Sequence, residues 1–468
     1  SEVESIAREF RARELPCDVL WMDIDYMDGH RSFTFDPVGF PAPRTLSDTL
    51  HAHGFKSIWI LDPHLRQEPG YAPYDEGTRG GHWVTWPDGT PYTGKVWPGL
   101  CVFPDFLNRD ARAWWGRLTL DFVDRSGADG IWNDMNEPAV FEVEGKTMPL
   151  TVRHDADPEL GGPGFHGRYH NVYGMQMARA TYEGLRTGRP DRRPFVLSRA
   201  NYLGGQRYAA AWTGDNRATD EHLHMALPMV LNLGLSGQPF AGPDIGGFAE
   251  PCTGEDFARW FGLGTLLPFA RAHTEKHNIR KEPWSFGPRV EALCRRALQT
   301  RYRLLPYLYT AFEEAARTGC PVARPAFFAD PRAEWLRTCE HEFLLGGDVL
   351  VDLALDDATR DARRLSADTR AWQPATIVAG APEPLLLGAM LLWANMHGGF
   401  TLGLMLAGAF ALDAVVGARD NAERRSLFFA WAKFGVAAGL VACVTPYGYE
   451  SILVTSRIFS LGDALNMI

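Results

Sequence analysis

Short, continuously apolar segments alternate with longer helical segments over residues 17–273, and this alternation constrains the fold more than any other feature. Strands that are apolar throughout are buried on both faces, which is typical of a parallel sheet covered by helices. The helices between them end at glycine, the residue favoured just past a helix C-terminus; examples are 46–53 before Gly54 and 109–125 near Gly127. The predicted strands are 18–24, 56–61, 130–133, 194–197, 209–213, 238–241 and 267–270.

Polar residues follow nearly every one of these seven strands. A (β/α)₈ TIM barrel places its active site at the C-terminal ends of its strands, so the pattern predicts an α/β protein of that class. A doubly wound open sheet is the alternative, but it concentrates polar groups at one switch point. The strand-end residues are Asp23, Asp25, Asp62, Asp134, Arg199, Asp215, Asp244 and His273.

The chain divides by sequence character into four predicted regions. Residues 1–318 hold the barrel, which includes a strongly helical stretch at 289–316. Residues 319–352 are shorter and strand-like and predict the start of a C-terminal β domain. Residues 353–383 are polar and rich in Asp, Arg, Ala and Pro, as in a linker, and residues 384–468 form an apolar helical tail.

The apolar tail predicts membrane-type helices. Residues 384–412 contain no charged residue, and about 20 apolar residues suffice to span a bilayer. A second apolar stretch, 427–444, is interrupted only by Lys433. Arginines 419, 424 and 425 lie between the stretches and would make that loop cytoplasmic. A pair of buried helices in a globular domain is the alternative.

Composition excludes several partners. A net charge of −10 argues against nucleic acid, which binds basic surfaces. The seven cysteines are scattered without a CxxC pair or a Cys/His cluster, so neither a disulfide framework nor a zinc site is expected. No signal peptide is evident and residues 1–15 already have helical periodicity, so we expect a fragment that begins within the fold. The expected location is the bacterial cytoplasm, with association with the membrane through residues 384–444 if the apolar tail is part of the protein.

Two acids are the best candidates for chemistry at a sugar. Retaining glycoside hydrolysis uses two carboxyl groups about 5 Å apart, one ionised and one protonated. Asp134 ends an apolar strand in Gly-Ile-Trp-Asn-Asp-Met-Asn-Glu-Pro, where polar neighbours are expected to lower its pKa and suit a nucleophile. Asp215 ends Ala-Trp-Thr-Gly-Asp-Asn, where a closed site beside Trp212 is expected to raise its pKa and suit a general acid. The alternatives are a helix cap for the first and an Asx turn for the second.

Further residues have the chemistry of a sugar-binding site. Asp23 and Asp25 are two apart and share one face while the strand continues, which suits sugar hydroxyls better than a metal. Arg199 suits a hydroxyl or a carboxylate, and His273 a hydroxyl, although a lone histidine is more often structural. Trp97 lies in a loop that could wall a pocket.

Five motifs together resemble glycoside hydrolase family 31, the α-glucosidase and α-xylosidase family, over residues 1–351. They are WMDIDYMDGHRSFTFD, KVWPG with FPDF, WNDMNEP, SRANYLGGQRYAAAWTGDN, and GPDIGGF with PFARAH, in family order. The resemblance implies Asp134 as nucleophile, Asp215 as acid/base and no metal or organic cofactor. It also implies that the −1 sugar subsite is lined by Asp23, Ile60, Trp97, Trp132, Met135, Arg199, Trp212, Asp244, Phe248 and His273.

The sequence departs from the family pattern at both ends. The N-terminal β-sandwich and the first barrel strand are missing, and segments of the tail, such as WANMHGGF, resemble pieces of a bacterial multi-span membrane protein. The main hypothesis is a retaining exo-α-glycosidase, an α-glucosidase that acts on terminal non-reducing glucose of α-linked oligosaccharides. The alternatives are an α-xylosidase or α-transglucosidase, an inactive carbohydrate-binding remnant, and a chimeric membrane-associated protein. Oligomeric state is not predicted.

Overall fold

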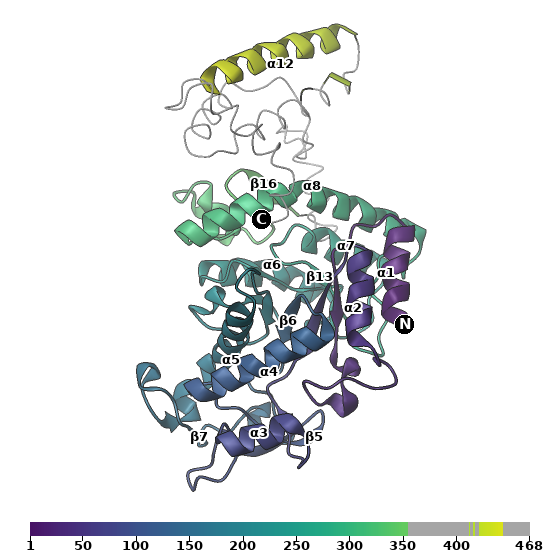
Figure 1. The fold of residues 1–468 in the computed structure, drawn as a ribbon. Coiled ribbons are helices and arrows are strands. Elements are labelled where there is room, and N and C mark those ends of the chain that lie inside the picture. The colour runs from purple at the N-terminus through teal and green to yellow at the C-terminus, as the bar shows by residue number, and fades with distance from the viewer. Residues whose placement is uncertain (354–410, 412–414, 417–420, 443–468) are drawn as a thin grey trace. The chain divides into compact units, whose positions relative to one another are not determined.

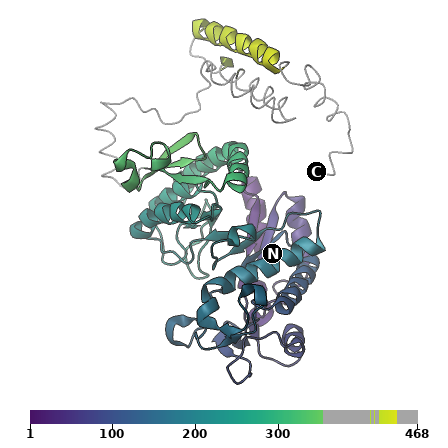
Figure 2. The same ribbon diagram turned by 90° about the vertical axis from the view of Figure 1, so that its left-hand side faces the viewer.

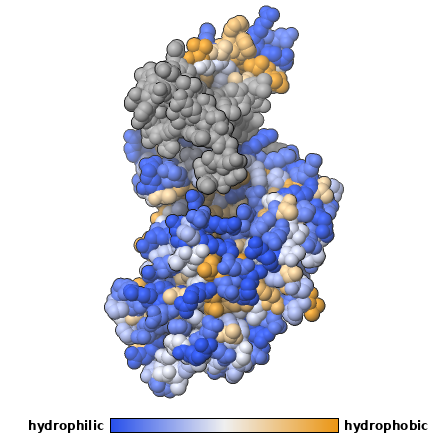
Figure 3. Space-filling view, in the orientation of Figure 1, coloured by the Kyte–Doolittle hydropathy of each residue, from blue (hydrophilic) through white to orange (hydrophobic). Residues whose placement is uncertain are grey.

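The structure, a computed structural model, describes residues 1–353, 411, 415–416 and 421–442. The chain divides into two compact units, Ser1–Ser366 and Ala367–Ile468. The face of the first unit seen in Figure 3 is mostly hydrophilic and is broken by small apolar patches.

A parallel sheet is the centre of the first unit (Figure 1). Six strands pair side by side, and two more form a second parallel pair. The six are β1 Val19–Met22, β2 Lys56–Leu61, β6 Gly130–Asn133, β9 Val196–Ser198, β10 Ala210–Trp212 and β11 Ala241–Gly242, followed by the pair β12 Asp244–Ile245 and β13 Arg271–Ala272. Only Pro243, which has no N–H to donate to a sheet, separates β11 from β12, so they occupy one strand position. The structure therefore has seven strand positions, the number that the sequence predicts, and the barrel class is confirmed.

Proline also explains where the predicted strand limits were wrong. The strand expected at 267–270 lies later, at β13, and Pro268 falls within the expected range. The strand expected at 238–241 begins only at Ala241, two residues after Pro239. A proline removes the donor that a central strand needs, so regular pairing starts after it.

Helices pack against the outside of the sheet (Figures 1 and 2). The predicted helix at 109–125 is α4, and Gly127 caps it with φ 72°. The helices α4 and α5 pack so closely that Gly116 and Gly184 meet backbone to backbone. The helices are α1 Glu2–Ala12, α2 Pro43–Ala52, α3 Ala72–Gly80, α4 Arg109–Ser126, α5 His166–Gly188, α6 Asp220–Leu235, α7 Gly254–Gly264 and α8 Pro288–Thr318.

Two small antiparallel sheets extend the loops of the first half of the barrel. One consists of β3 Leu65–Arg66, β5 Gly99–Val102 and β4 Thr93–Val96 in that order, and the other of β7 Arg153–His154 and β8 Gly164–Phe165. The turn between β4 and β5 carries Trp97.

The barrel sheet is not closed between β13 and β1 in the described residues. Each of these strands pairs on one side only, β1 with β2 and β13 with β12. A cavity of about 1230 Å³ lies here, lined by residues of both edges and by apolar side chains of α8 such as Leu305 and Leu308. The first barrel strand that the sequence analysis expects to be missing stays a prediction.

A three-stranded antiparallel sheet follows α8. It consists of β14 Ala323–Pro325, β15 Glu342–Leu345 and β16 Val349–Asp352. Phe343 and Leu345 are fully buried in a core shared with α6, α7 and α8. A separate β domain from residue 319 stays a prediction, and the predicted linker lies outside the described residues beyond Leu353.

The second unit is described mainly through α12, Asn421–Ala442. Arg424 and Arg425 lie in this helix, whereas the sequence predicted a loop between two spanning segments there. No helix among the described residues is both long and apolar enough to cross a membrane. The first predicted span, 384–412, lies outside the described residues except for residue 411.

Candidate active site

The sheet register brings three strand ends into one row. Leu61 is opposite Asn133, and Asn133 is opposite Ser198, so the residues that follow these three positions are neighbours. Those residues are Asp62, Asp134 and Arg199. The backbone continues the pairing for one step, because the Arg199 N–H donates to the Asn133 carbonyl at 3.1 Å.

Arg199 is the centre of a carboxylate cluster, which we define as Asp134, Glu137 and Asp215. Its Nε lies 3.1 Å from an oxygen of Asp134 and 2.7 Å from one of Glu137. One of its terminal nitrogens lies 3.5 Å from Asp215. A single guanidinium therefore holds both predicted catalytic acids, and Glu137 orients the guanidinium.

The pKa of Asp134 is raised to about 7, so the expectation of a lowered pKa was wrong. Burial is the main cause: its side chain is only 15% exposed, and the carboxylate loses solvation. The positive charge of Arg199 and the hydrogen bond from the Met135 N–H act in the opposite direction but do not outweigh burial. Met135 has a left-handed φ of 54°, a strained conformation that supports a functional turn directly after Asp134.

Asp215 lies in a more open place than the sequence predicted. Its side chain is 52% exposed, although Trp212, three residues before it, is buried. Gly214 precedes it with φ 78°, so the chain turns sharply at the end of β10 and projects the carboxyl from the strand end. The structure thus supports its place in the cluster but not the closed environment expected around it.

Asp23 and His273 face each other across the open seam of the sheet. His273 Nε2 lies 3.4 Å from an oxygen of Asp23. Burial and the nearby charge of Arg271 hold the pKa of His273 well below its ordinary value, so its ring is neutral. The predicted shared face of Asp23 and Asp25 was wrong: the strand ends at Met22, and Asp25 instead pairs with Lys276 at 2.8 Å.

Asp244 is fully buried and pairs with Arg271, whose nitrogens lie 2.6 and 3.2 Å from one of its oxygens. Burial raises the pKa of Asp244 to about 6, although Arg271 acts to lower it. Its other oxygen has no hydrogen-bond partner and is available to a ligand. The Arg271 guanidinium lies over the rings of Trp21, Trp132 and Trp212, with its carbon 4.4–5.2 Å from their centres.

Most of the other predicted substrate-binding residues lie near these groups. Trp132 packs edge-on against Trp212 and His273, and Phe248 stacks on His273 with ring centres 5.3 Å apart. Ile60 is buried in β2 opposite Trp132. Trp97 is different: it packs on Phe141, and no described contact joins it to the carboxylate cluster.

Residues 1–311 match the family described as "Glycosyl hydrolases family 31 TIM-barrel domain". The chain belongs to glycoside hydrolase family 31. It is 46% identical over 350 residues to alpha-glucosidase 2 of Bacillus thermoamyloliquefaciens. The matched region covers 75% of this chain and 44% of that relative. Two solved family 31 structures are also similar, and each covers only part of the neighbour.

The family 31 alpha-glucosidase from Bacteroides thetaiotaomicron has a TM-score of 0.68 and 45% identity over 79% of this chain and 57% of its own. The glucosidase II alpha subunit in its alpha3-Glc2-bound form has a TM-score of 0.72 and 36% identity over 76% of this chain and 38% of its own. The chain therefore spans about two fifths to just over half of the length of these relatives.

Two charged residues near the cluster, Asp62 and Arg271, were not assigned a role from the sequence, and Glu137 was expected only as a polar neighbour that fixes the Asp134 side chain. Asp62 was noted only as a strand-end residue, but it is buried without a hydrogen-bond partner, and burial and Asp134 raise its pKa well above the ordinary value. Glu137 lies within the quoted WNDMNEP motif, and Arg271 within PFARAH. The signal that could have indicated a role for these residues is a charged side chain inside an apolar motif at a strand end.

Two cavities adjoin the site, but neither Asp134 nor Asp215 lines either of them. One of about 580 Å³ is lined by Glu137, Arg199, Trp212 and Gly214 together with the end of α6. The larger cavity at the open seam reaches Arg271 and His273. Arg199 and Trp212 line only the smaller of these cavities.

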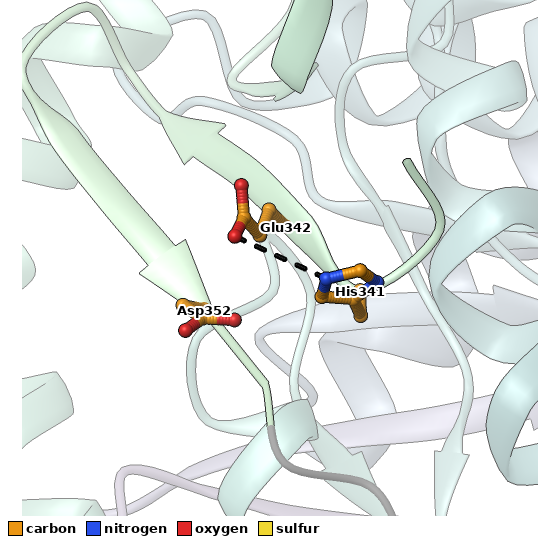
Figure 4. A group of neighbouring side chains, drawn as sticks. All are labelled: His341, Glu342 and Asp352. Carbon is orange, nitrogen blue, oxygen red and sulfur yellow. Dashed lines mark ion pairs between the residues drawn. The ribbon is translucent and has the colours of Figure 1, made fainter. Parts of the chain in front are cut away.

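One group of possible metal ligands occurs in the described residues, on the antiparallel sheet and away from the carboxylate cluster. His341, Glu342 and Asp352 offer atoms within 4.8 Å of one another (Figure 4). Glu342 and Asp352 are paired across β15 and β16, and His341 Nε2 lies 3.9 Å from Glu342. Partly exposed groups of this kind are common without an ion, and we assign no metal to them.

Proposed function

We propose that the protein is a retaining, exo-acting α-glucosidase in which Asp134 is the nucleophile and Asp215 the acid/base. The single observation that carries this proposal is the Arg199 guanidinium, which contacts both acids at the strand ends of a family 31 barrel. The names of its relatives, including alpha-glucosidase 2, support glucose as the sugar. Substrates are α-linked oligosaccharides with a terminal non-reducing glucose.

The proposed reaction has two steps. The Asp134 carboxylate attacks the anomeric carbon while the Asp215 carboxyl gives its proton to the departing oxygen. The Asp215 carboxylate then takes a proton from a water molecule, which attacks the glycosyl–Asp134 ester and releases glucose with retained configuration. Arg199 holds the nucleophile in place and favours its ionised form.

The other predicted residues form the sugar subsite in this proposal. A neutral His273 offers a ring nitrogen to a sugar hydroxyl, and the unpartnered oxygen of Asp244 accepts one. Apolar ring faces favour the C–H faces of a sugar. The proposed subsite residues are Asp23, Ile60, Trp97, Trp132, Met135, Arg199, Trp212, Asp244, Phe248 and His273.

The raised pKa of Asp134 makes the assignment of roles worth a direct test, because a raised pKa also suits a general acid. Azide, added to variants that act on an activated aryl α-glucoside, distinguishes the two roles. Asp134→Ala is expected to give β-glucosyl azide, since azide replaces the nucleophile and inverts the centre. Asp215→Ala is expected to give α-glucosyl azide, since azide then attacks the covalent intermediate. The opposite stereochemistry would exchange the roles.

Asp25→Asn is a matched control, because Asp25 pairs with Lys276 outside the cluster. It is expected to keep wild-type turnover. A wild-type protein that binds glucose without turnover would support the inactive carbohydrate-binding alternative, for which the open seam of the sheet is the supporting observation. Activity on α-xylosides above α-glucosides would support the xylosidase alternative. The cytoplasmic location stays a prediction.

A further inference from the structure

A buried lysine and a buried cysteine lie in direct contact beside the site. Lys281 and Cys252 are each only 5% exposed, and Nζ lies 2.9 Å from Sγ. Cys252 directly precedes Thr253, the N-cap of α7, whereas Lys281 belongs to the segment between β13 and α8. The two residues are 29 positions apart, so only the fold brings them together.

The lysine is fixed in this place by two further contacts. Its Nζ donates to the Gly246 carbonyl at 3.0 Å. Its stem passes over Gly246, where an added Cβ would lie 3.1 Å from Lys281 Cδ, and the glycine has a left-handed φ of 91°. The amine is therefore held against the sulfur and does not sample open solvent.

The charges around the pair favour a reactive sulfur. Within residues 1–353, no carboxylate forms an ion pair with Lys281, and a buried ammonium needs a counter-charge. A thiolate at Cys252 is the counter-charge within reach of this amine, since Nζ and Sγ are in contact. The N-terminus of α7, an 11-residue helix, adds positive potential next to that thiolate.

A small oxidant can approach the pair from the side of Lys281, since Cys252 itself does not line the cavity at the open seam. Lys281 lines the cavity of about 1230 Å³ at the open seam between β13 and β1. Thiolates, not thiols, are the form that peroxide oxidises. The geometry thus combines a fixed amine, an ionisable sulfur and an approach for hydrogen peroxide.

We propose that Cys252 and Lys281 form a reversible oxygen-bridged cross-link, Cys–S–O–NH–Lys, on exposure to hydrogen peroxide. In the first step the thiolate attacks one peroxide oxygen, the O–O bond breaks, and Cys252 becomes a sulfenic acid with release of hydroxide, which takes the proton of the Lys281 ammonium, leaves as water and frees the amine. In the second step another peroxide oxidises the amine nitrogen, the N–O bond forms and two waters leave. In sum, Cys–SH + Lys–NH₂ + 2 H₂O₂ gives Cys–S–O–NH–Lys + 3 H₂O.

The cross-link joins two segments that carry residues of the sugar subsite. Cys252 and Phe248 lie in the segment between β12 and α7. Lys281 and His273 lie in the segment between β13 and α8. Phe248 and His273 already stack with ring centres 5.3 Å apart. The bond therefore ties these two strand-end segments together, and we expect it to raise the thermal stability of the barrel unit.

Intact mass spectrometry of the full chain, with and without peroxide, tests the proposal. The bridge adds one oxygen and removes two hydrogens, a gain of about 14 Da that excess dithiothreitol reverses. After digestion, the peptides that contain Cys252 and Lys281 are expected to migrate as one species. A gain of about 16 Da confined to Cys252, a loss of about 2 Da from a direct S–N bond, or no change would each overturn the proposal.

Variants separate the pair from general oxidation. Cys252→Ser and Lys281→Met are each expected to abolish the 14 Da gain, and the conservative serine variant keeps the test valid if the methionine variant does not fold. Cys294→Ser is the matched control, because Cys294 is equally buried but has no lysine hydrogen bond within residues 1–353. It is expected to form the bridge as the wild type does. Because the readout is mass, the result does not depend on glucosidase activity.

Discussion

Asp134→Asn is expected to stabilise the protein at neutral and alkaline pH. The fold raises the pKa of Asp134 from 3.8 to about 7, which means that it holds the protonated carboxyl more tightly than the unfolded chain does. Stability from this group is therefore fully present below pH 3.8 and is lost as pH rises through about 7. Asparagine imitates the neutral carboxyl at every pH and so avoids that loss.

The magnitude follows from the size of the shift. The difference between 7 and 3.8 is about three pH units, and each unit corresponds to about 1.4 kcal/mol, so the upper limit is about 4 kcal/mol. The Asp134→Asn variant would lose the charge contact to Arg199, but that guanidinium keeps Glu137 at 2.7 Å. We expect the variant to be more stable than the wild type by about 2–4 kcal/mol at pH 8.

Thermal unfolding of both proteins from pH 4 to pH 8.5 measures this difference. It should be near zero at pH 4, grow by up to about 1.4 kcal/mol per pH unit, and level off above about pH 7. The control is Asp121→Asn, whose side chain is 63% exposed and pairs with Arg125; it should show no such growth. A difference that is independent of pH, or a variant less stable than the wild type at pH 8, would refute the raised pKa.

Three further predictions concern catalysis and packing. Because the proposed nucleophile must be ionised, kcat/KM on an α-glucoside should fall about tenfold for each pH unit below about 7 and be about a hundredfold lower at pH 5. A pH–rate profile in which kcat/KM falls only below about pH 4 would contradict the burial of Asp134. Arg199→Met removes a charge that lowers the pKa of Asp134, so the fall in kcat/KM at acidic pH should begin about one pH unit or more higher. An unchanged pH dependence would exclude an influence of Arg199 on that pKa. Gly184→Ala places a Cβ 2.4 Å from the Gly116 backbone and should cost about 1–3 kcal/mol, whereas Gly262→Ala, with open space around it, should be neutral or stabilising in denaturant unfolding.

The fold was predictable because its signals are local. Apolar strands and glycine-ended helices repeat along the chain, and each strand end carries its own polar residue. The limits of strands at Pro239 and Pro268 were less predictable, because they depend on which backbone donors the neighbouring strand requires. The prediction that Asp23 and Asp25 share one face was wrong for a related reason, because it assumed that the strand continues, whereas the strand ends at Met22.

The electrostatics of the site could not be predicted in the same way. A motif shows which polar groups stand beside Asp134, but the degree of burial, which dominates its pKa, is set by several strands together. Arg271 is a further example, because its guanidinium pairs with Asp244 and lies over three tryptophans from three different strands. The contact between Cys252 and Lys281 has no sequence signal at all, since neither residue belongs to a spaced motif.

The raised pKa values of the site have a common meaning under the proposed mechanism. Asp62, Asp134 and Asp244 all lie in a buried region where desolvation outweighs the two arginines, so the free protein holds carboxyl groups that are costly to ionise. The transition state of glycoside hydrolysis carries positive charge on the sugar ring, and that charge stabilises nearby carboxylates. The same burial that destabilises an ionised Asp134 in the free protein therefore strengthens its attraction to the transition state, which is how differential binding accelerates a reaction. A gain in stability for Asp134→Asn and a loss of turnover are then two consequences of one arrangement, and the first can be measured without any substrate.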